Sequence, residues 1–220
     1  VQEHRDKITE ATYSLPCAVH QKVGRAEQLA TPKALAAADK EFNKLANMPH
    51  PDGQGFGVWD ISKPIESSEA RDKHRKAGET AHFGFIGELV FEKNSELDRA
   101  SPDDREWKGR HVFLGNQIKD EHFDYAQFEE LGSSPPTMEA AMAIDALSLL
   151  PGWELTQSDA VSAYTQQFLG GGRNKGTPTY VGLPKHRWPK EWHGKYKNPV
   201  VPLILNLYGH VDAGGWWESY

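Results

Sequence analysis

The chain has 220 residues, of which 38% are hydrophobic and 25% are charged, and its formal net charge is −6. This length fits one large or two small domains with a modest core, and the acidic balance argues against a simple basic nucleic-acid-binding domain. The single cysteine excludes an internal disulfide, and no apolar run reaches the length of a membrane span. With a polar N-terminus unlike a secretory signal, we expect an intracellular protein of the cytoplasm or nucleus.

Polar sequence precedes the first predicted helix. Residues 1–31 are polar and weakly periodic, and we interpret them as an N-terminal extension. Thr31 is suited to cap a helix and Pro32 to stand in its first turn, and apolar side chains then recur at helical spacing up to Asn47. The apolar face of this predicted helix is formed by Leu35, Ala38, Phe42 and Leu45.

A second helix and a hairpin are predicted next. Residues 58–61 suggest a short strand, and the charged residues 67–77 suggest a helix that Gly78 ends as a C-terminal cap. Residues 82–93 and 107–115 both have strand character and are separated by a polar loop, so they predict a long antiparallel hairpin.

The C-terminal half mixes helices and strands. A helix is predicted over residues 137–150, and short strands over 153–158, 179–184 and 200–207. Because helices and strands do not alternate in a regular βαβ order, the sequence predicts an α+β fold.

The carboxylate of Asp159 is a candidate functional group because of its position after a predicted strand. Asp159 follows the predicted strand 153–158, and residues 160–168 read as a turn of helix with Tyr164 five positions after the aspartate. Polymerases use such a carboxylate to hold a divalent metal, with the aromatic ring packed against the sugar of a nucleotide. The strand pattern alone favours the commoner role of an aspartate that caps the following helix.

The charge balance reverses between Arg173 and Lys197, where basic residues far outnumber the single acidic residue Glu191 and alternate with aromatic ones. Such a mixture suits single-stranded nucleic acid, through phosphate pairing and base stacking. It is equally consistent with a solvated basic loop whose tryptophans cover the edge of a core. The candidate nucleic-acid contacts are Lys185, Arg187, Trp188, Lys190 and Trp192.

Several segments resemble, in the right order, the motifs of copia-type retrotransposon reverse transcriptases. Residues 152–164 resemble the first catalytic motif, G-W-x-hydrophobic-x-Q-x-D-V-x-x-A-F. Residues 108–117 are similar to the fingers motif K-x-R-L-V-x-x-G-x-x-Q, residues 179–184 to Y-V-x-x-P, and residues 207–217 to L-Y-G-L-K-Q-A-P-R-x-W. The spacing that opens the family's domain is echoed by Ala37, Glu41, Leu45 and Trp59.

The resemblance covers about residues 32–220 and implies a right-hand polymerase, with a fingers-like region over 32–135 and part of a palm over 136–220. It implies RNA- or DNA-templated DNA synthesis from deoxynucleoside triphosphates with Mg²⁺, on a nucleic acid template–primer.

The resemblance also implies roles for individual residues. Asp159 would be catalytic and would bind the metal. Ala160 and Tyr164 would line the nucleotide site, with Tyr164 excluding a 2′-hydroxyl, and Arg110 would contact the triphosphate. A basic residue there would balance the phosphate charge.

The sequence also departs from the family pattern. Val211-Asp212 replaces the Lys-Gln of the L-Y-G motif, and the second catalytic motif, Tyr-Val-Asp-Asp, would lie beyond Tyr220. We therefore expect an incomplete reverse transcriptase that is inactive alone. The alternatives are a non-catalytic nucleic-acid binder and a structural subunit of a larger host assembly, and the net charge of −6 and the missing acids favour both over an active enzyme.

Overall fold

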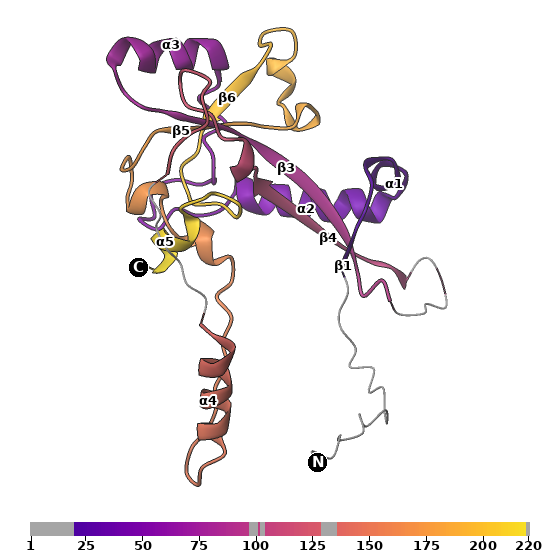
Figure 1. Cartoon of the computed structure of the whole chain (residues 1–220). Coiled ribbons are helices and arrows are strands. Elements are labelled where there is room, and N and C mark those ends of the chain that lie inside the picture. The colour runs from indigo at the N-terminus through magenta and orange to yellow at the C-terminus, as the bar shows by residue number, and fades with distance from the viewer. Residues whose placement is uncertain (1–19, 97–100, 102–103, 129–135, 219–220) are drawn as a thin grey trace, which may run out of the picture.

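The computed structural model describes residues 20–96, 101, 104–128 and 136–218, and these form an α+β fold around one mixed sheet (Figure 1). The strands are β1 (His20–Lys22), β2 (Ile65–Glu66), β3 (His82–Lys93), β4 (Glu106–Phe113), β5 (Thr179–Gly182) and β6 (Pro199–Pro202). The helices are α1 (Arg25–Ala30), α2 (Pro32–Ala46), α3 (Ser67–Ala77), α4 (Met138–Ser148) and α5 (Ala213–Glu218). The order of the sheet is β1-β3-β5-β6-β2, and β4 pairs with β3.

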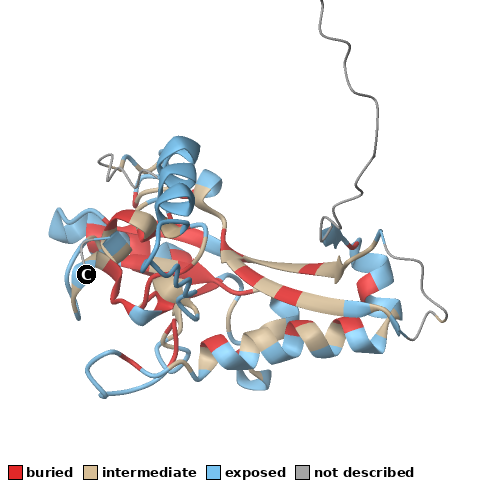
Figure 2. Ribbon diagram, turned by 90° about the horizontal axis from the view of Figure 1, so that it is seen from below, coloured by how far each residue is buried: buried red, intermediate tan, exposed pale blue. Residues whose placement is uncertain are grey.

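Strand β3 joins two parts of the molecule. Its first residues, His82 to Phe85, pair in parallel with β5, and the remainder, from Ile86 to Lys93, pairs antiparallel with β4. The first third of the strand therefore lies in the compact body, and the rest forms, with β4, a long hairpin that runs beside α2 (Figure 1). Buried residues gather in the body and along the side of α2 that faces the hairpin (Figure 2).

Helix α2 packs closely on β4 because small residues meet there. Ala34 and Ala38 of the helix are fully buried and form a cluster with Val90 of β3. A Cβ atom on Gly109 would stand 2.4 Å from the carbonyl oxygen of Ala37, so no residue with a side chain fits at this crossing without moving the helix. The contact fixes how the hairpin lies on the helix.

Several predicted elements are confirmed. The helices predicted from Thr31 and over residues 67–77 and 137–150 are α2, α3 and α4, and the predicted hairpin is β3 with β4. Gly78 caps α3 with φ of 65°, as expected of a glycine in this position. Thr31 occupies the N-cap position of α2, but its side chain makes no capping hydrogen bond.

Other predicted strands are shorter or missing. The strand predicted over 58–61 is reduced to an isolated bridge between Trp59 and Leu203, and the strand predicted over 200–207 ends at Pro202, which has no N–H to continue the ladder.

The strand predicted over 153–158 is not formed. These residues are exposed and follow α4 in an arm that projects from the body (Figure 1), where no described strand pairs with them. Because a strand gains its backbone hydrogen bonds only from a neighbour, the alternating sequence does not produce a strand here.

A buried carboxylate ties the hairpin to distant segments. The side chain of Glu88, on β3, is 4% exposed. Its oxygen atoms lie 2.6–3.1 Å from side-chain nitrogen atoms of Arg25, Gln28, His111, His186 and Arg187. Burial alone would raise the pKa of Glu88, but the hydrogen bonds from His111, His186 and Arg187 hold that pKa well below its usual range. We call these six residues the Glu88 cluster.

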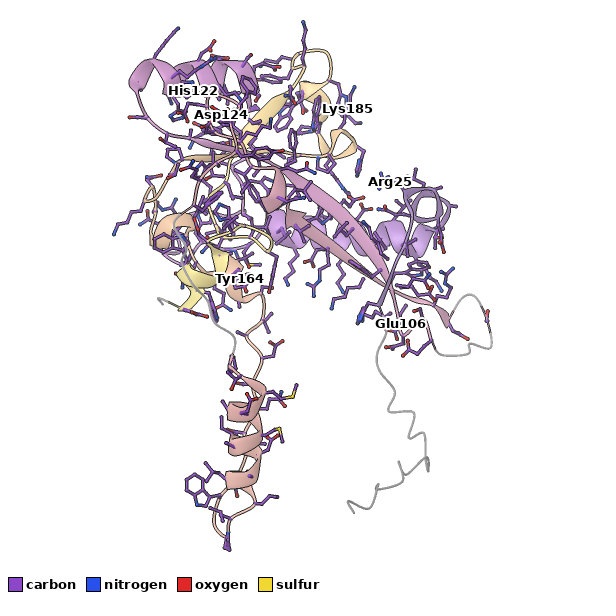
Figure 3. The ribbon with its side chains drawn as sticks, viewed as in Figure 1. Arg25, Glu106, His122, Asp124, Tyr164 and Lys185 are labelled. Atoms are coloured by element: carbon purple, nitrogen blue, oxygen red, sulfur yellow. The ribbon has the colours of Figure 1, made fainter. Side chains whose placement is uncertain are left out.

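Replacing Glu88 by Gln should destabilise the chain by about 3–5 kcal/mol, because Arg25 and Arg187 would lose a buried counter-charge. The free energy of unfolding, from urea titrations monitored by circular dichroism, measures this. The matched control is Glu106→Gln at the tip of the hairpin (Figure 3), where the carboxylate is 61% exposed and 3.6 Å from the Lys93 ammonium. That change should cost less than about 1 kcal/mol.

The difference in stability between the natural chain and Glu88→Gln should depend on pH. Because the pKa of Glu88 is lowered in the folded chain, its stabilisation is complete above the ordinary value of 4.5 and is lost as the pH falls below it. The difference in stability between the natural chain and Glu88→Gln should therefore narrow in acid. Equal stability of the two chains at pH 7 would contradict the role of the cluster.

Candidate functional site

The candidate site is built on the turn that contains Tyr208. The backbone N–H of Phe113, at the end of β4, donates to the carbonyl oxygen of Tyr208 over 2.8 Å. Gly209 follows with φ of 89°, and a Cβ atom on it would lie 2.1 Å from the Phe113 oxygen. A Cβ atom on Gly115 would lie 2.2 Å from the oxygen of Gly209. Two glycines therefore allow this turn to lie directly against the end of β4.

Side chains from separate segments converge on the ring of Tyr208. The ring centroids of Tyr164 and Tyr208 are 4.8 Å apart, and the guanidinium carbon of Arg110 is 6.0 Å from the Tyr208 centroid. Burial raises the pKa of the Tyr208 phenol. The charge of Arg110 lowers this pKa, whereas Tyr164, Asp159 and Glu41 raise it further. We call Arg110, Asp159, Tyr164 and Tyr208 the Tyr208 cluster.

Positive charge accumulates on one side of this cluster. Lys108 and Arg110 are two positions apart on β4, so they lie on the same face of the strand. The pKa of Lys108 is lowered, first by burial and then by the neighbouring charges of Arg110 and Lys93. Such crowding of cations is relieved by a bound anion.

Arg110 is only loosely held by the protein. Its side chain is 40% exposed, and its guanidinium is 3.8 Å from the carboxylate of Glu41 on α2. An exposed ion pair at this distance contributes little to stability, so Arg110 can exchange it for another anion. Also on α2, the ammonium of Lys44 donates to the hydroxyl of Ser162.

Of the predicted site residues, Arg110 and Tyr164 lie beside the ring of Tyr208, although they come from distant parts of the sequence. Asp159, in the same segment as Tyr164, contributes through its charge, which raises the pKa of the Tyr208 phenol. Asp159 and the adjacent Ala160 are exposed, and Asp159 does not end a strand. Nor does it cap the helical turn that follows: a 3₁₀ turn spans Ala163–Gln166, and its N-cap position is taken by Ser162 with φ of 56°.

The donor set for a metal is small. Among the described residues, no three His, Cys, Asp or Glu side chains lie close enough together to hold a metal ion. Asp159 offers one carboxylate, which is within the range of one or two carboxylates that Mg²⁺ uses together with water and phosphate oxygens.

The residues of the basic and aromatic stretch divide into two groups. Arg187 points inward, where it bonds to Glu88 and Asp39, and Trp192 is 5% exposed in the main core. Trp188 is half-buried and its indole N–H donates to the Leu183 oxygen over 2.9 Å.

Lys185 and Lys190 are exposed. The Lys185 ammonium is 5.9 Å from the Trp188 ring centroid, and this end of the stretch lies well apart from Tyr164 (Figure 3). Of the five candidate contacts, Arg187, Trp188 and Trp192 are thus bonded or packed within the fold, and Lys185 and Lys190 are exposed.

Sequence reasoning alone did not identify Tyr208 as the centre of the site. The signal was its position before Gly209, because a glycine that must hold a positive φ marks a turn pressed against other backbone. Lys44 and Ser162 were also missed. Lys44 belongs to no motif, Ser162 stands at an unspecified position of the first catalytic motif, and 118 residues separate the two.

No family model matches the chain, and neither a curated protein nor a solved structure is detectably similar to it. None of the helices within the described residues combines the length and the apolar character that crossing a bilayer requires.

Proposed function

We propose that this chain is the fingers and the first part of the palm of a copia-type reverse transcriptase, and that the Tyr208 cluster is the side of its nucleotide site that binds the triphosphate. The observation that carries this proposal is the convergence of Arg110 and Tyr164 on the ring of Tyr208, whose phenol also responds to the charge of Asp159. Arg110, Tyr164 and Tyr208 come from three separate segments that resemble family motifs, and Asp159 shares the segment of Tyr164.

The chemistry of the cluster suits an incoming deoxynucleoside triphosphate. Arg110 and Lys108 supply positive charge for the phosphates, and charge-assisted bonds of this kind are among the stronger ones in proteins. Tyr164 offers an aromatic face to the sugar. Asp159 would supply one ligand to Mg²⁺, which when bound neutralises charge on the transferring phosphate.

The proposed partners are a template–primer and a deoxynucleoside triphosphate. Templated polymerisation needs metal-binding acids on both sides of the reacting oxygens. The 220 residues contain no Tyr-Val-Asp-Asp motif, so we assign nucleotide binding to this chain and not a complete polymerase centre.

Replacing Arg110 by Gln should weaken binding of a deoxynucleoside triphosphate with Mg²⁺ by about tenfold or more, because a hydrogen bond between charged groups contributes about 1.5–3 kcal/mol. Isothermal titration calorimetry measures the dissociation constant, and inorganic triphosphate should compete. The control is Arg75→Gln on α3, since Arg75 is 39% exposed, nearly the same as Arg110 at 40%, and also forms an ion pair. Equal affinities of the two variants would contradict the proposal.

The purified chain should not extend a primer, because it carries Asp159 without the paired acids of the second motif. The assay is primer extension with all four deoxynucleotides and either Mg²⁺ or Mn²⁺, compared with a reaction lacking protein. Extension that disappears in Asp159→Asn would be the opposite result. It would mean that another acid, such as Asp145 or Asp212, completes the centre.

A second candidate function is non-catalytic binding of single-stranded nucleic acid, favoured by the exposed Lys185 and Lys190 beside Trp188. It does not require any metal-binding acid. Arg187 and Trp192, also predicted as contacts, would act in this case by holding the surface in place.

Replacing Lys185 and Lys190 together by Gln should weaken binding of an oligothymidylate and reduce the slope of its logarithmic salt dependence by about 0.7 for each phosphate that is no longer neutralised. Fluorescence anisotropy over a series of salt concentrations measures both quantities. The matched double variant is Lys73→Gln with Lys76→Gln on α3, where both lysines are exposed. Unchanged affinity and slope in the first variant would assign these lysines to a solvated loop.

A further inference from the structure

A cavity of about 290 Å³ lies between the start of β3, the segment leading into β5, and α5. Its lining includes His82, Phe128, Thr177, His210 and Trp216. None of the residues of the Tyr208 cluster lines it, although His210 follows Tyr208 by two positions. The cavity is therefore distinct from the proposed nucleotide site.

Two buried imidazoles line the cavity, and one of them has a ring nitrogen without a partner among the described residues. His82 and His210 are each 6% exposed. The backbone N–H of Asp212 donates to Nδ1 of His210 over 3.2 Å, so the proton of the neutral ring is on Nε2. No described residue accepts a hydrogen bond from that Nε2 atom. Buried polar groups without partners are rare in folded proteins, and a bound water, ion or other ligand is one way in which the missing bond is supplied.

The charge of the cavity excludes an anionic ligand. Among the described residues, its lining contains no Lys or Arg, and it includes Asp212. Burial lowers the pKa of His82, and burial followed by the charge of His82 lowers the pKa of His210 to about 4, so both rings are neutral at physiological pH. A phosphate or carboxylate would therefore find no counter-charge. A cation would meet the Nε2–H group of His210. Because this group is a hydrogen-bond donor, it needs an acceptor and does not attract a positive charge.

Aromatic rings form two walls of the cavity. The ring centroids of His82 and Phe128 are 4.7 Å apart, and Phe128 also lies 5.7 Å from His210. The indole of Trp216 lies against Gly171, where an added Cβ atom would be 3.0 Å from the ring. Aromatic faces combined with neutral donors and acceptors are the means by which proteins hold an unstacked base.

We propose that this cavity binds a single neutral nucleobase, presented either by a free nucleoside or by an unpaired position of a strand. Its volume, just below the range of about 300–1,000 Å³ usual for ligand pockets, suits one base with part of its sugar and leaves no room for a chain of phosphates. The proposal goes beyond the proposed function and does not rest on it, because its residues and its charge differ from those of the Tyr208 cluster.

The test is titration of the chain with adenosine, guanosine, cytidine and uridine, followed by the imidazole nitrogen and proton resonances of His82 and His210 in two-dimensional NMR spectra. At least one nucleoside should shift both sets of resonances saturably at millimolar concentration. Because no phosphate is bound, the affinity should not depend on salt. Failure of all four nucleosides to shift the His82 resonances would overturn the proposal.

Variants locate the site. His82→Phe keeps an aromatic ring against Phe128 but removes the polar atoms, and should weaken binding at least tenfold. Thr177→Phe places a ring in the cavity from its loop and should abolish binding while both imidazoles remain. His122→Phe is the matched control, since that imidazole is 60% exposed and does not line the cavity (Figure 3), and it should bind as the natural chain does.

Further titrations identify the source of the base and distinguish this proposal from the proposed function. If a strand presents the base, an oligonucleotide with one unpaired base should shift the same resonances, and its abasic counterpart should not. Shifts by nucleosides alone would assign the cavity to free nucleosides. Arg110→Gln should leave nucleoside affinity unchanged, whatever its effect on triphosphate binding. Nucleoside binding that persists in Thr177→Phe would place the ligand elsewhere and overturn the proposal, even if His82→Phe fails to fold.

Discussion

The buried carboxylate of Glu88 sets the geometry on which the rest of the structure depends. It lies on β3 shortly after the strand changes its partner from β5 to β4, and its bonds reach α1, β4 and the turn at Arg187. The register pairs Glu88 with His111, whose imidazole is directed to the carboxylate at 3.1 Å. Because side chains alternate along a strand, fixing His111 inward directs Arg110 to the other face. The position of the cationic side of the candidate site thus follows from a charge buried in the hairpin.

Close approaches of backbone make up the second constraint. Gly109, Gly115 and Gly209 each stand where a Cβ atom would lie within 2.4 Å of a carbonyl oxygen. All three fall in segments that resemble reverse transcriptase motifs, yet packing alone accounts for them. They bring α2, β4 and the Tyr208 turn together, and the chemistry of the site must be argued from Arg110, Tyr164 and Asp159 instead.

Local pattern predicted the helices and the hairpin, because periodicity and caps such as Gly78 are read within a few residues. It did not predict the Glu88 cluster, in which Arg25 and Arg187 meet the carboxylate from 63 and 99 residues away. Nor could the spacing of the basic and aromatic residues tell that Arg187 and Trp192 face inward while Lys185 faces outward. That distinction is set by where other elements lie and not by the stretch itself.

The two sides of the candidate site differ in how they are held. Arg110 and Tyr208 are placed by the hairpin register and by the backbone bond from Phe113 to Tyr208. Asp159 instead follows an arm whose apolar side chains are exposed, among them Met138 at 77% and Leu149 at 86%. Residues 153–158 carry the alternation of a strand, but a strand is stabilised only when a neighbour supplies hydrogen bonds and covers one face. The cationic side of the candidate site is therefore fixed by contacts within the described residues. Placing the carboxylate at a strand end requires a pairing partner for the arm.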